Sequence, residues 1–244
     1  MIKNDLQFYD LNADKWWDED AKIYALYHLN KPRFEFFDRY VSNWQGLKAL
    51  DVGCGGGFSC EFMAKRGVIV SGIDRSQPCI ETARKHAAKS CFEIDYRCGV
   101  AETMPYPDNT FDVVICVDVL EHVDNLSRVI AEISRILKPN GLFFFDTINR
   151  NFKSRLVMIW LMENILGEIS KGVHDWNKFI KPNELIELLD KNGFTNVQIK
   201  GFDLFGEMWR LNFDNYRKYK TTKTFDVIIN DNISINYIGK AIKN

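Results

Sequence analysis

The sequence predicts an α/β fold in which a mostly parallel sheet is covered by helices on both faces. Near-continuous apolar segments of strand length alternate with helical segments over residues 47–148, which is typical of parallel strands that are buried on both sides. A glycine cluster follows the first of these strands, and an acid, Asp74, ends the second. The chain of 244 residues can bury one full core, and no linker or repeat divides it. We therefore expect a single domain over residues 1–244.

The first 150 residues predict a cap followed by the core of the sheet. Residues 1–46 place aromatic residues among charged ones at helical spacing, which indicates a helical cap over the sheet. Residues 47–150 alternate between strand and helix patterns. We expect strands over 47–52, up to 74, and over 93–98, 111–117 and 142–148, with helices over 57–66, 78–89 and 125–137 between them.

The remaining residues predict the edge of the sheet. Residues 151–180 are expected to form a lid or insertion, and residues 181–244 to complete the sheet. In this last part we expect a helix at 182–192, strands at 195–204 and 225–240, and between them a polar aromatic stretch at 206–220 that helps to roof a pocket. Because no helix separates the two late strands, they predict an antiparallel hairpin at the edge of a seven-stranded sheet.

The glycine cluster predicts a nucleoside-binding site. Residues 47–57 read LKALDVGCGGG, and Asp74 closes the next apolar strand. Glycines let a ligand approach bare backbone, and an acid at the tip of the neighbouring strand can accept hydrogen bonds from both ribose hydroxyls. The third glycine of a dinucleotide fingerprint is missing, because Phe58 or Cys60 stands there, and the Lys-Ser/Thr ending of a phosphate-binding loop is absent.

The loop DVGCGGG resembles motif I of the class I S-adenosylmethionine (SAM) methyltransferases, and residues 99–123 resemble the middle motifs of the same family. The resemblance implies a Rossmann-like class I methyltransferase fold with SAM as cofactor. In that family the turn at 101–102 borders the adenine, and the end of the fourth strand lies beside the sulfonium. By position, cofactor contacts then fall on Arg33, Asp51, Gly53, Cys54, Gly55, Asp74, Arg75, Ala101, Glu102 and Val117.

Three further stretches narrow the resemblance: Trp16-Trp17 with residues 29–33, residues 147–151 and residues 171–182. Together they resemble the 3-demethylubiquinone 3-O-methyltransferase family of quinone biosynthesis. This implies O-methylation of a hydroxylated aromatic ring, with a polyprenyl catechol or quinone precursor as a candidate acceptor. It also implies that Arg33 binds the cofactor carboxylate from the cap, with a solvated arginine on a helix surface as the alternative.

A divalent cation is a second implied cofactor. In the resembled family an acid, a glutamate and a histidine after the fourth strand bind such an ion, and the matching residues are Asp118, Glu121 and His122. Oxygen ligands favour magnesium or manganese, which would help the acceptor hydroxyl to lose its proton. Asp118 replaces the usual glutamate and shortens the reach by one methylene. The same turn occurs in class I methyltransferases without a metal, where it caps a helix and lines the pocket.

Two histidines are candidates for the general base. A phenol is a poor nucleophile while protonated, and His122 or His174 could accept its proton. Asp175, next to His174, could fix the tautomer of that ring. A loop histidine bound to a backbone carbonyl is the alternative for His174.

Residues 153–166 form an apolar segment preceded by cations. The segment is too short to cross a bilayer. It predicts either peripheral contact with a membrane that holds a lipid substrate or a buried helix over the acceptor pocket. No signal region opens the chain and no longer apolar run follows, so we expect a cytoplasmic protein. The first alternative for residues 153–166 would place it at the inner face of the membrane.

Composition excludes other classes of protein. Thirty-two Lys and Arg residues against 33 Asp and Glu leave a net charge of −1, so no positive field recruits nucleic acid. The six cysteines lack the spacing of a zinc site. The sequence thus predicts a SAM-dependent O-methyltransferase acting on an aromatic ring. An O- or N-methyltransferase of small natural products and a lipid-associated adaptor without turnover stay as alternatives.

Overall fold

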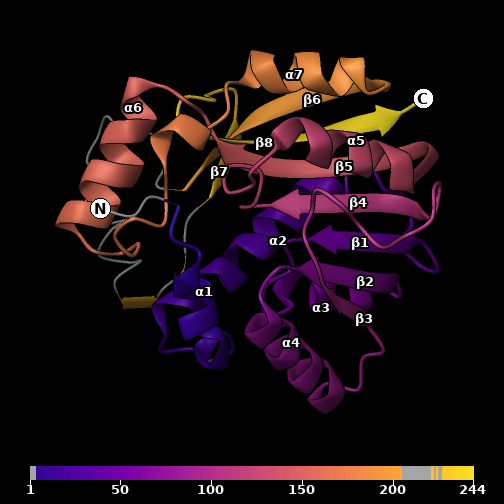
Figure 1. The fold of residues 1–244 in the computed structure, drawn as a ribbon, viewed down its shortest axis with the longest axis horizontal. Coiled ribbons are helices and arrows are strands. Elements are labelled where there is room, and N and C mark those ends of the chain that lie inside the picture. The colour runs from indigo at the N-terminus through magenta and orange to yellow at the C-terminus, as the bar shows by residue number, and fades with distance from the viewer. Residues whose placement is uncertain (1–3, 205–220, 223, 225–226) are drawn as a thin grey trace.

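A computed structural model describes residues 4–204, 221–222, 224 and 227–244. Within these residues, eight strands form one sheet in the order β3-β2-β1-β4-β5-β8-β6-β7 (Figure 1). The first five run parallel to one another, and β8 lies antiparallel between β5 and β6. The predicted α/β fold, with a mostly parallel sheet and an antiparallel edge, is confirmed. The strands are β1 Lys48–Val52, β2 Ile69–Asp74, β3 Asp95–Cys98, β4 Phe111–Val117, β5 Leu137–Ile148, β6 Phe194–Asp203, β7 Ile228–Asn230 and β8 Asn236–Lys243.

Helices cover both faces of the sheet. One face carries α2 (Ala25–Phe37), α3 (Phe58–Ala64) and α4 (Gln77–Lys89), and the other carries α5 (Leu126–Ile136) and α7 (Pro182–Lys191). Side chains alternate between the two cores along each strand. In β4, for example, Ile115 joins the first core and Val114 the second. This two-sided burial explains the unbroken apolar runs of the core strands.

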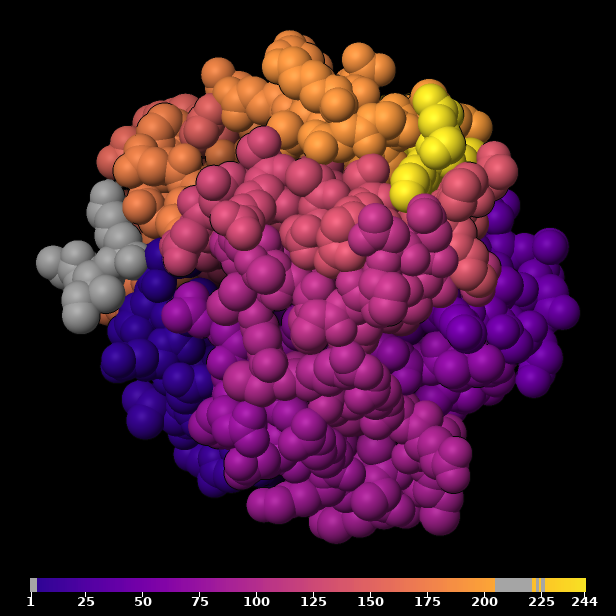
Figure 2. Space-filling model, turned by 45° about the vertical axis from the view of Figure 1, so that its right-hand side comes forward, coloured from indigo at the N-terminus to yellow at the C-terminus, as the bar shows by residue number. Residues whose placement is uncertain are grey.

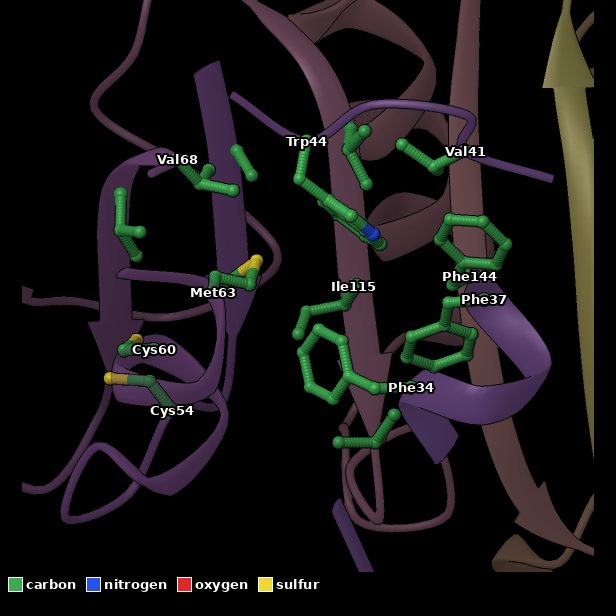
Figure 3. Packing of buried hydrophobic residues seen from close by; sticks show 14 of the residues in the cluster. Phe34, Phe37, Val41, Trp44, Cys54, Cys60, Met63, Val68, Ile115 and Phe144 are labelled. Atoms are coloured by element: carbon green, nitrogen blue, oxygen red, sulfur yellow. The ribbon is translucent and has the colours of Figure 1, made fainter. Parts of the chain in front are cut away.

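Aromatic side chains attach α2 to the sheet. Phe34 and Phe37 have no exposed surface, and the ring of Phe37 stacks on Phe144 of β5 with 4.4 Å between centroids. Figure 3 shows these rings together with Ile115 of β4 and Trp44. Complete burial of such a side chain contributes roughly 1.5–3 kcal/mol. The helix that carries Arg33 is therefore held firmly against the sheet.

The structure corrects two of the predicted element bounds. Strand β5 begins at Leu137, where α5 has just ended, because Leu137 pairs with Phe111 before a register shift in the ladder. The predicted strand 225–240 contains two strands, β7 and β8, so the sheet has eight strands in the described residues instead of seven. Between them the side chains of Asn230 and Asn232 accept from backbone N–H groups two residues ahead, as turn-forming asparagines do. The predicted stretch 206–220 lies outside the described residues.

The N-terminal cap reaches the carboxyl ends of the parallel strands. It begins with the short helix α1 (Gln7–Leu11), and the backbone N–H of Asp5 donates to the carbonyl of Gly172 at 2.9 Å. Lys22 Nζ donates to the carbonyl of Gly167 at 2.6 Å. Figure 2 shows the indigo surface of these residues close to the coral and orange surface of the segment that follows β5. The N-terminal cap and the segment after β5 thus meet over the carboxyl ends of the parallel strands.

The apolar segment is one helical stretch with two different faces. It starts as α6 (Phe152–Ser154) and continues as a π-helix, Arg155–Ile165. Val157, Met158 and Met162 are buried, and on the other side the apolar side chains are exposed: Phe152 by 77%, Leu156 by 44%, Trp160 by 55% and Ile165 by 54%. Among the described residues, no helix has both the length and the apolar character to cross a membrane.

Candidate active site

A cavity of about 520 Å³ opens at the carboxyl ends of the parallel strands. Parallel α/β sheets bind their ligands at this edge. Its walls come from the cap, from the glycine loop after β1, from the end of β2, from residues 99–102 and from the turn after β4. All ten residues predicted to contact the cofactor line this one cavity: Arg33, Asp51, Gly53, Cys54, Gly55, Asp74, Arg75, Ala101, Glu102 and Val117.

The loop after β1 needs its glycines for conformation and for space. Gly53 and Gly55 have φ angles of 74° and 50°, in the left-handed region that favours glycine. A Cβ on Gly55 would lie 2.3 Å from the ring of Trp16, and a Cβ on Gly53 would lie 2.2 Å from the side chain of Val119. The backbone of the loop therefore forms part of the cavity wall.

Asp74 is fixed at the end of β2 by backbone donors. Its carboxylate accepts from the N–H of Gly55 and from the N–H of Ser76, both at 2.8 Å. Burial raises the pKa of Asp74, and these two hydrogen bonds act in the opposite direction. Each carboxylate oxygen can accept a further bond, so the group is oriented and still able to hold a pair of hydroxyls.

Asp51 carries a buried acceptor that lacks a partner. The side chain is 1% exposed and lines the cavity. Its Oδ2 accepts from the thiol of Cys60 at 3.4 Å, whereas Oδ1 has no hydrogen-bond partner among the described residues. Burial raises the pKa of Asp51 to about 7. Because an unpartnered buried carboxylate oxygen is costly, the position suits a cationic or hydrogen-bonding group of a ligand.

Arg33 joins the cap to the ends of β4 and β5. Its Nε donates to Asp146 Oδ2 at 2.6 Å and its Nη2 to Asp118 Oδ2 at 2.5 Å. Burial alone would lower the pKa of Arg33, but these two carboxylates raise it above its usual range. The side chain is 2% exposed, so the alternative of a solvated arginine is wrong. Asp118 itself has a φ of 55°, and its N–H donates to Asp146 Oδ1 at 2.8 Å.

The two other residues of the predicted metal set have different partners. Glu121 is 2% exposed and accepts from Thr147 Oγ1 at 2.7 Å. Burial, and next the charge of Asp118, raise the pKa of Glu121 to about 8. His122 faces Asn4, with 2.9 Å between its Nδ1 and the Oδ1 of that residue. Asp118 and His122 line the cavity, and Glu121 lies behind its wall.

The two predicted catalytic histidines lie against each other. The rings of His122 and His174 stack with centroids 5.3 Å apart and planes 21° apart. His122 borders the cavity and His174 does not. Burial lowers the pKa of His122 well below its usual range, so the ring is a neutral proton acceptor at physiological pH. The carboxylate that contacts His174 is Glu163, 2.7 Å from its Nδ1, whereas the adjacent Asp175 accepts from the N–H of Asn177. The alternative of a backbone-bound His174 is therefore wrong.

Comparison with known proteins places the chain in a family. A model of the methyltransferase domain matches residues 50–145. A ubiquinone biosynthesis O-methyltransferase of Idiomarina loihiensis is 40% identical over 190 residues, which cover 78% of each chain. Another, of Pasteurella multocida, is 38% identical over 230 residues, covering 89% of this chain and 95% of that protein. This chain belongs to the ubiquinone biosynthesis O-methyltransferase family. It is therefore a SAM-dependent methyltransferase, as its motifs predicted.

Solved structures agree on the fold of this methyltransferase. A SAM-dependent methyltransferase of Thermotoga maritima superposes with a TM-score of 0.65 at 18% identity, over 98% of this chain and 99% of that one. A protein of Pyrococcus horikoshii gives 0.65 at 20% identity over the same shares. At these identities the likeness concerns the fold alone.

The residues present in this methyltransferase fit SAM. The unpartnered Oδ1 of Asp51 is a buried acceptor of the kind that an ammonium group satisfies. Gly53 and Gly55 themselves line the cavity, and Asp74 is held with free acceptor positions. The same cavity thus offers groups for the amino-acid end and for the ribose.

The residues do not fit a divalent cation in the same way. Asp118 is bound by Arg33, Glu121 by Thr147 and His122 by Asn4. Across the part of the chain that the structure describes, no group of three His, Cys, Asp or Glu residues could hold a metal ion. The guanidinium of Arg33 already pairs with Asp118, so we derive no step through a metal.

Several residues of the site were missed from the sequence. Asn4 and Tyr9 line the cavity, and nothing in the sequence of the cap distinguishes them from its other polar and aromatic residues. Asp146 and Glu163 left a signal, because each is an acid inside an apolar run. Such acids are rarely buried without a charged or hydrogen-bonded partner, and each of these two has one.

Proposed function

We propose that this protein transfers the methyl group of SAM to a hydroxyl of a catechol-type ring that carries a polyprenyl chain, a precursor of ubiquinone. The observation that carries the proposal is the position of His122, a neutral base on the wall of the cofactor cavity, next to the turn that ends β4. The relatives' names support the acceptor class, since both are called ubiquinone biosynthesis O-methyltransferases.

Cofactor recognition follows from the geometry of the glycine loop. Asp74 would accept from the ribose hydroxyls of SAM, and Asp51 would accept from its ammonium through the unpartnered Oδ1. Arg33 would hold the cofactor carboxylate only with donors that Asp118 and Asp146 leave unused.

The chemical task of the protein is alignment and proton removal. Bound SAM would supply a methyl group on a positively charged sulfur. An oxygen nucleophile would attack the methyl carbon in line, with the sulfur as the leaving group. The protein must hold that oxygen within about 3.5 Å of the methyl carbon and accept its proton. His122 supplies the proton acceptor at the cavity wall, and the stacked ring of His174 supports it from behind.

A lipid-dissolved acceptor requires access from a membrane surface. We propose that the exposed apolar face of the helical stretch 152–165 contacts lipid there. Its four exposed apolar side chains stand beside Arg155, an exposed cation that suits anionic headgroups. Flotation with anionic vesicles tests this: a Trp160→Glu variant should bind less than the wild type. An Ile186→Glu variant, which changes an exposed apolar residue of α7, should bind as the wild type does. A wild type that fails to bind such vesicles would rule out the contact.

Turnover with defined acceptors tests the reaction. We expect S-adenosylhomocysteine and a methyl ether when a polyprenyl catechol is supplied with SAM, both detected by mass spectrometry. A catechol without the chain should react with a higher KM, because it lacks the apolar contacts of the tail. Methylation of small amines or phenols in preference to both would favour the natural-product alternative. Binding of SAM without any turnover would favour the adaptor.

A further inference from the structure

Glu163 is a buried acid on the inner side of an apolar helix. It belongs to the π-helix Arg155–Ile165, whose other buried residues are Val157, Met158 and Met162, and it is 2% exposed. A buried carboxylate is strongly unfavourable unless hydrogen bonds satisfy it. The position therefore needs an explanation beyond packing, since an apolar side chain would fill the same space at no such cost.

The partners of Glu163 lie in one loop. Its Oε2 accepts from the N–H of Gly172 at 3.0 Å, and its Oε1 accepts from the N–H of His174 at 3.1 Å. The same Oε1 lies 2.7 Å from Nδ1 of the His174 ring. One carboxylate thus holds both the backbone of the loop and the ring of its histidine.

These contacts fix the state of His174. A carboxylate beside Nδ1 favours the tautomer that carries its proton there, which leaves Nε2 with a lone pair. The ring is also held on its two other sides. Phe179 contacts it edge to face at 5.7 Å, and the His122 ring stacks on it at 5.3 Å. His122 in turn borders the cavity.

We infer that Glu163 is a positioning residue for methyl transfer: it fixes the tautomer and orientation of His174, and through the ring stack it fixes His122 at the wall of the cavity. This inference rests on the proposed function, in which His122 accepts the proton of the acceptor. Glu163 itself does not touch the cavity. Its effect is expected on the chemical step, and the binding of SAM should be untouched.

The test compares Glu163→Gln with the wild type by kinetics and by NMR. The amide keeps the size of the side chain and removes the charge. We expect kcat to fall roughly 10- to 100-fold, as when an orienting partner of a functional histidine is removed, with the SAM dissociation constant within twofold. In ¹⁵N spectra, the imidazole of His174 should change from one Nδ1-protonated tautomer to a mixture. Glu187→Gln removes the same charge from an exposed site on α7 and should match the wild type in every measurement.

A double-mutant cycle separates positioning from a general effect on stability. In a His174→Gln background, Glu163→Gln should cause no further loss of kcat, because the ring that it orients is gone. Equal losses in both backgrounds would overturn the inference, as would Glu163→Gln with unchanged kcat and an unchanged tautomer. If Glu163→Gln lowers the melting temperature strongly, Glu163→Asp supplies a milder second variant for the same cycle.

The spectroscopic readout distinguishes failure of the inference from failure of the proposed function. The tautomer of His174 can be measured on the full chain with S-adenosylhomocysteine and without any acceptor. If no catechol is methylated but the tautomer depends on Glu163, the proposed function fails and the contact stands. If catechols are methylated and the tautomer ignores Glu163, the proposed function stands and this inference is wrong.

Discussion

The two sides of the cavity are built from contacts of very different range. On the cofactor side, the carboxylate of Asp74 is held by Gly55, 19 residues away, and by Ser76, two residues away. On the acceptor side, the cap meets the turn after β4 through Asn4 and His122, which are 118 residues apart in sequence. The first side is a local motif, and the second is assembled only when the cap, the turn after β4 and the segment after β5 come together. We expect variants on the two sides to separate cofactor binding from turnover.

The largest effect is expected from the acceptor side. His122→Gln should lower kcat roughly 100- to 10,000-fold, the range of general-base catalysis, and should leave the dissociation constant of SAM within about threefold. Steady-state turnover and isothermal titration measure the two quantities. His28→Gln, at a histidine of α2 outside the cavity, is the matched control. A His122→Gln variant with wild-type kcat would remove the proposed base.

The next largest effect should appear on the cofactor side, where the binding of SAM should weaken and kcat should change little. Asp74→Asn keeps the shape but removes the charge and turns one acceptor oxygen into a donor. Loss of hydrogen bonds to a charged group of this kind costs about 1.5–3 kcal/mol, which corresponds to roughly 10- to 150-fold weaker binding of SAM. At saturating SAM, kcat should change by less than threefold. If Asp74→Asn lowers kcat and leaves binding intact, the division of the cavity into two sides is wrong.

The same difference in range explains what the sequence could predict. Local sequence predicts the strand pattern, the glycine loop and Asp74. Left-handed backbone favours glycines at neighbouring positions, and an acid at the end of a strand directly follows an apolar run. The ion pairs of Arg33 were not predictable, since they depend on where α2 crosses the ends of β4 and β5. His174 was recognised, but its partner was taken to be Asp175, the neighbour in sequence, whereas Glu163 reaches it from another element.

A smaller effect is expected in the dependence of stability on pH. Burial raises the pKa of Asp51 from its usual value of 3.8 to about 7, so the folded protein holds a proton there that the unfolded chain has lost. Between these values the folded state binds more protons, and the free energy of unfolding contributed by this group therefore falls as pH rises from about 4 to 7. Asp51→Asn should flatten that slope. Melting temperatures of both proteins without ligand, measured at half-unit steps across this window, check the expectation, and parallel curves would contradict it.

The smallest effect is expected from removal of divalent cations. Arg33 already pairs with both Asp118 and Asp146, and the partners of Glu121 and His122 are Thr147 and Asn4. Turnover of protein treated with a chelator should therefore stay within twofold of that with added Mg²⁺ or Mn²⁺. Electron paramagnetic resonance of Mn²⁺ checks binding directly, without any acceptor. Three results together would contradict this expectation: chelation abolishes turnover, Mn²⁺ restores it, and Asp118→Asn removes the signal of bound Mn²⁺. Arg33 would then have to release Asp118 during the reaction. The acceptor side would in that case rearrange on binding, whereas the cofactor side is already formed.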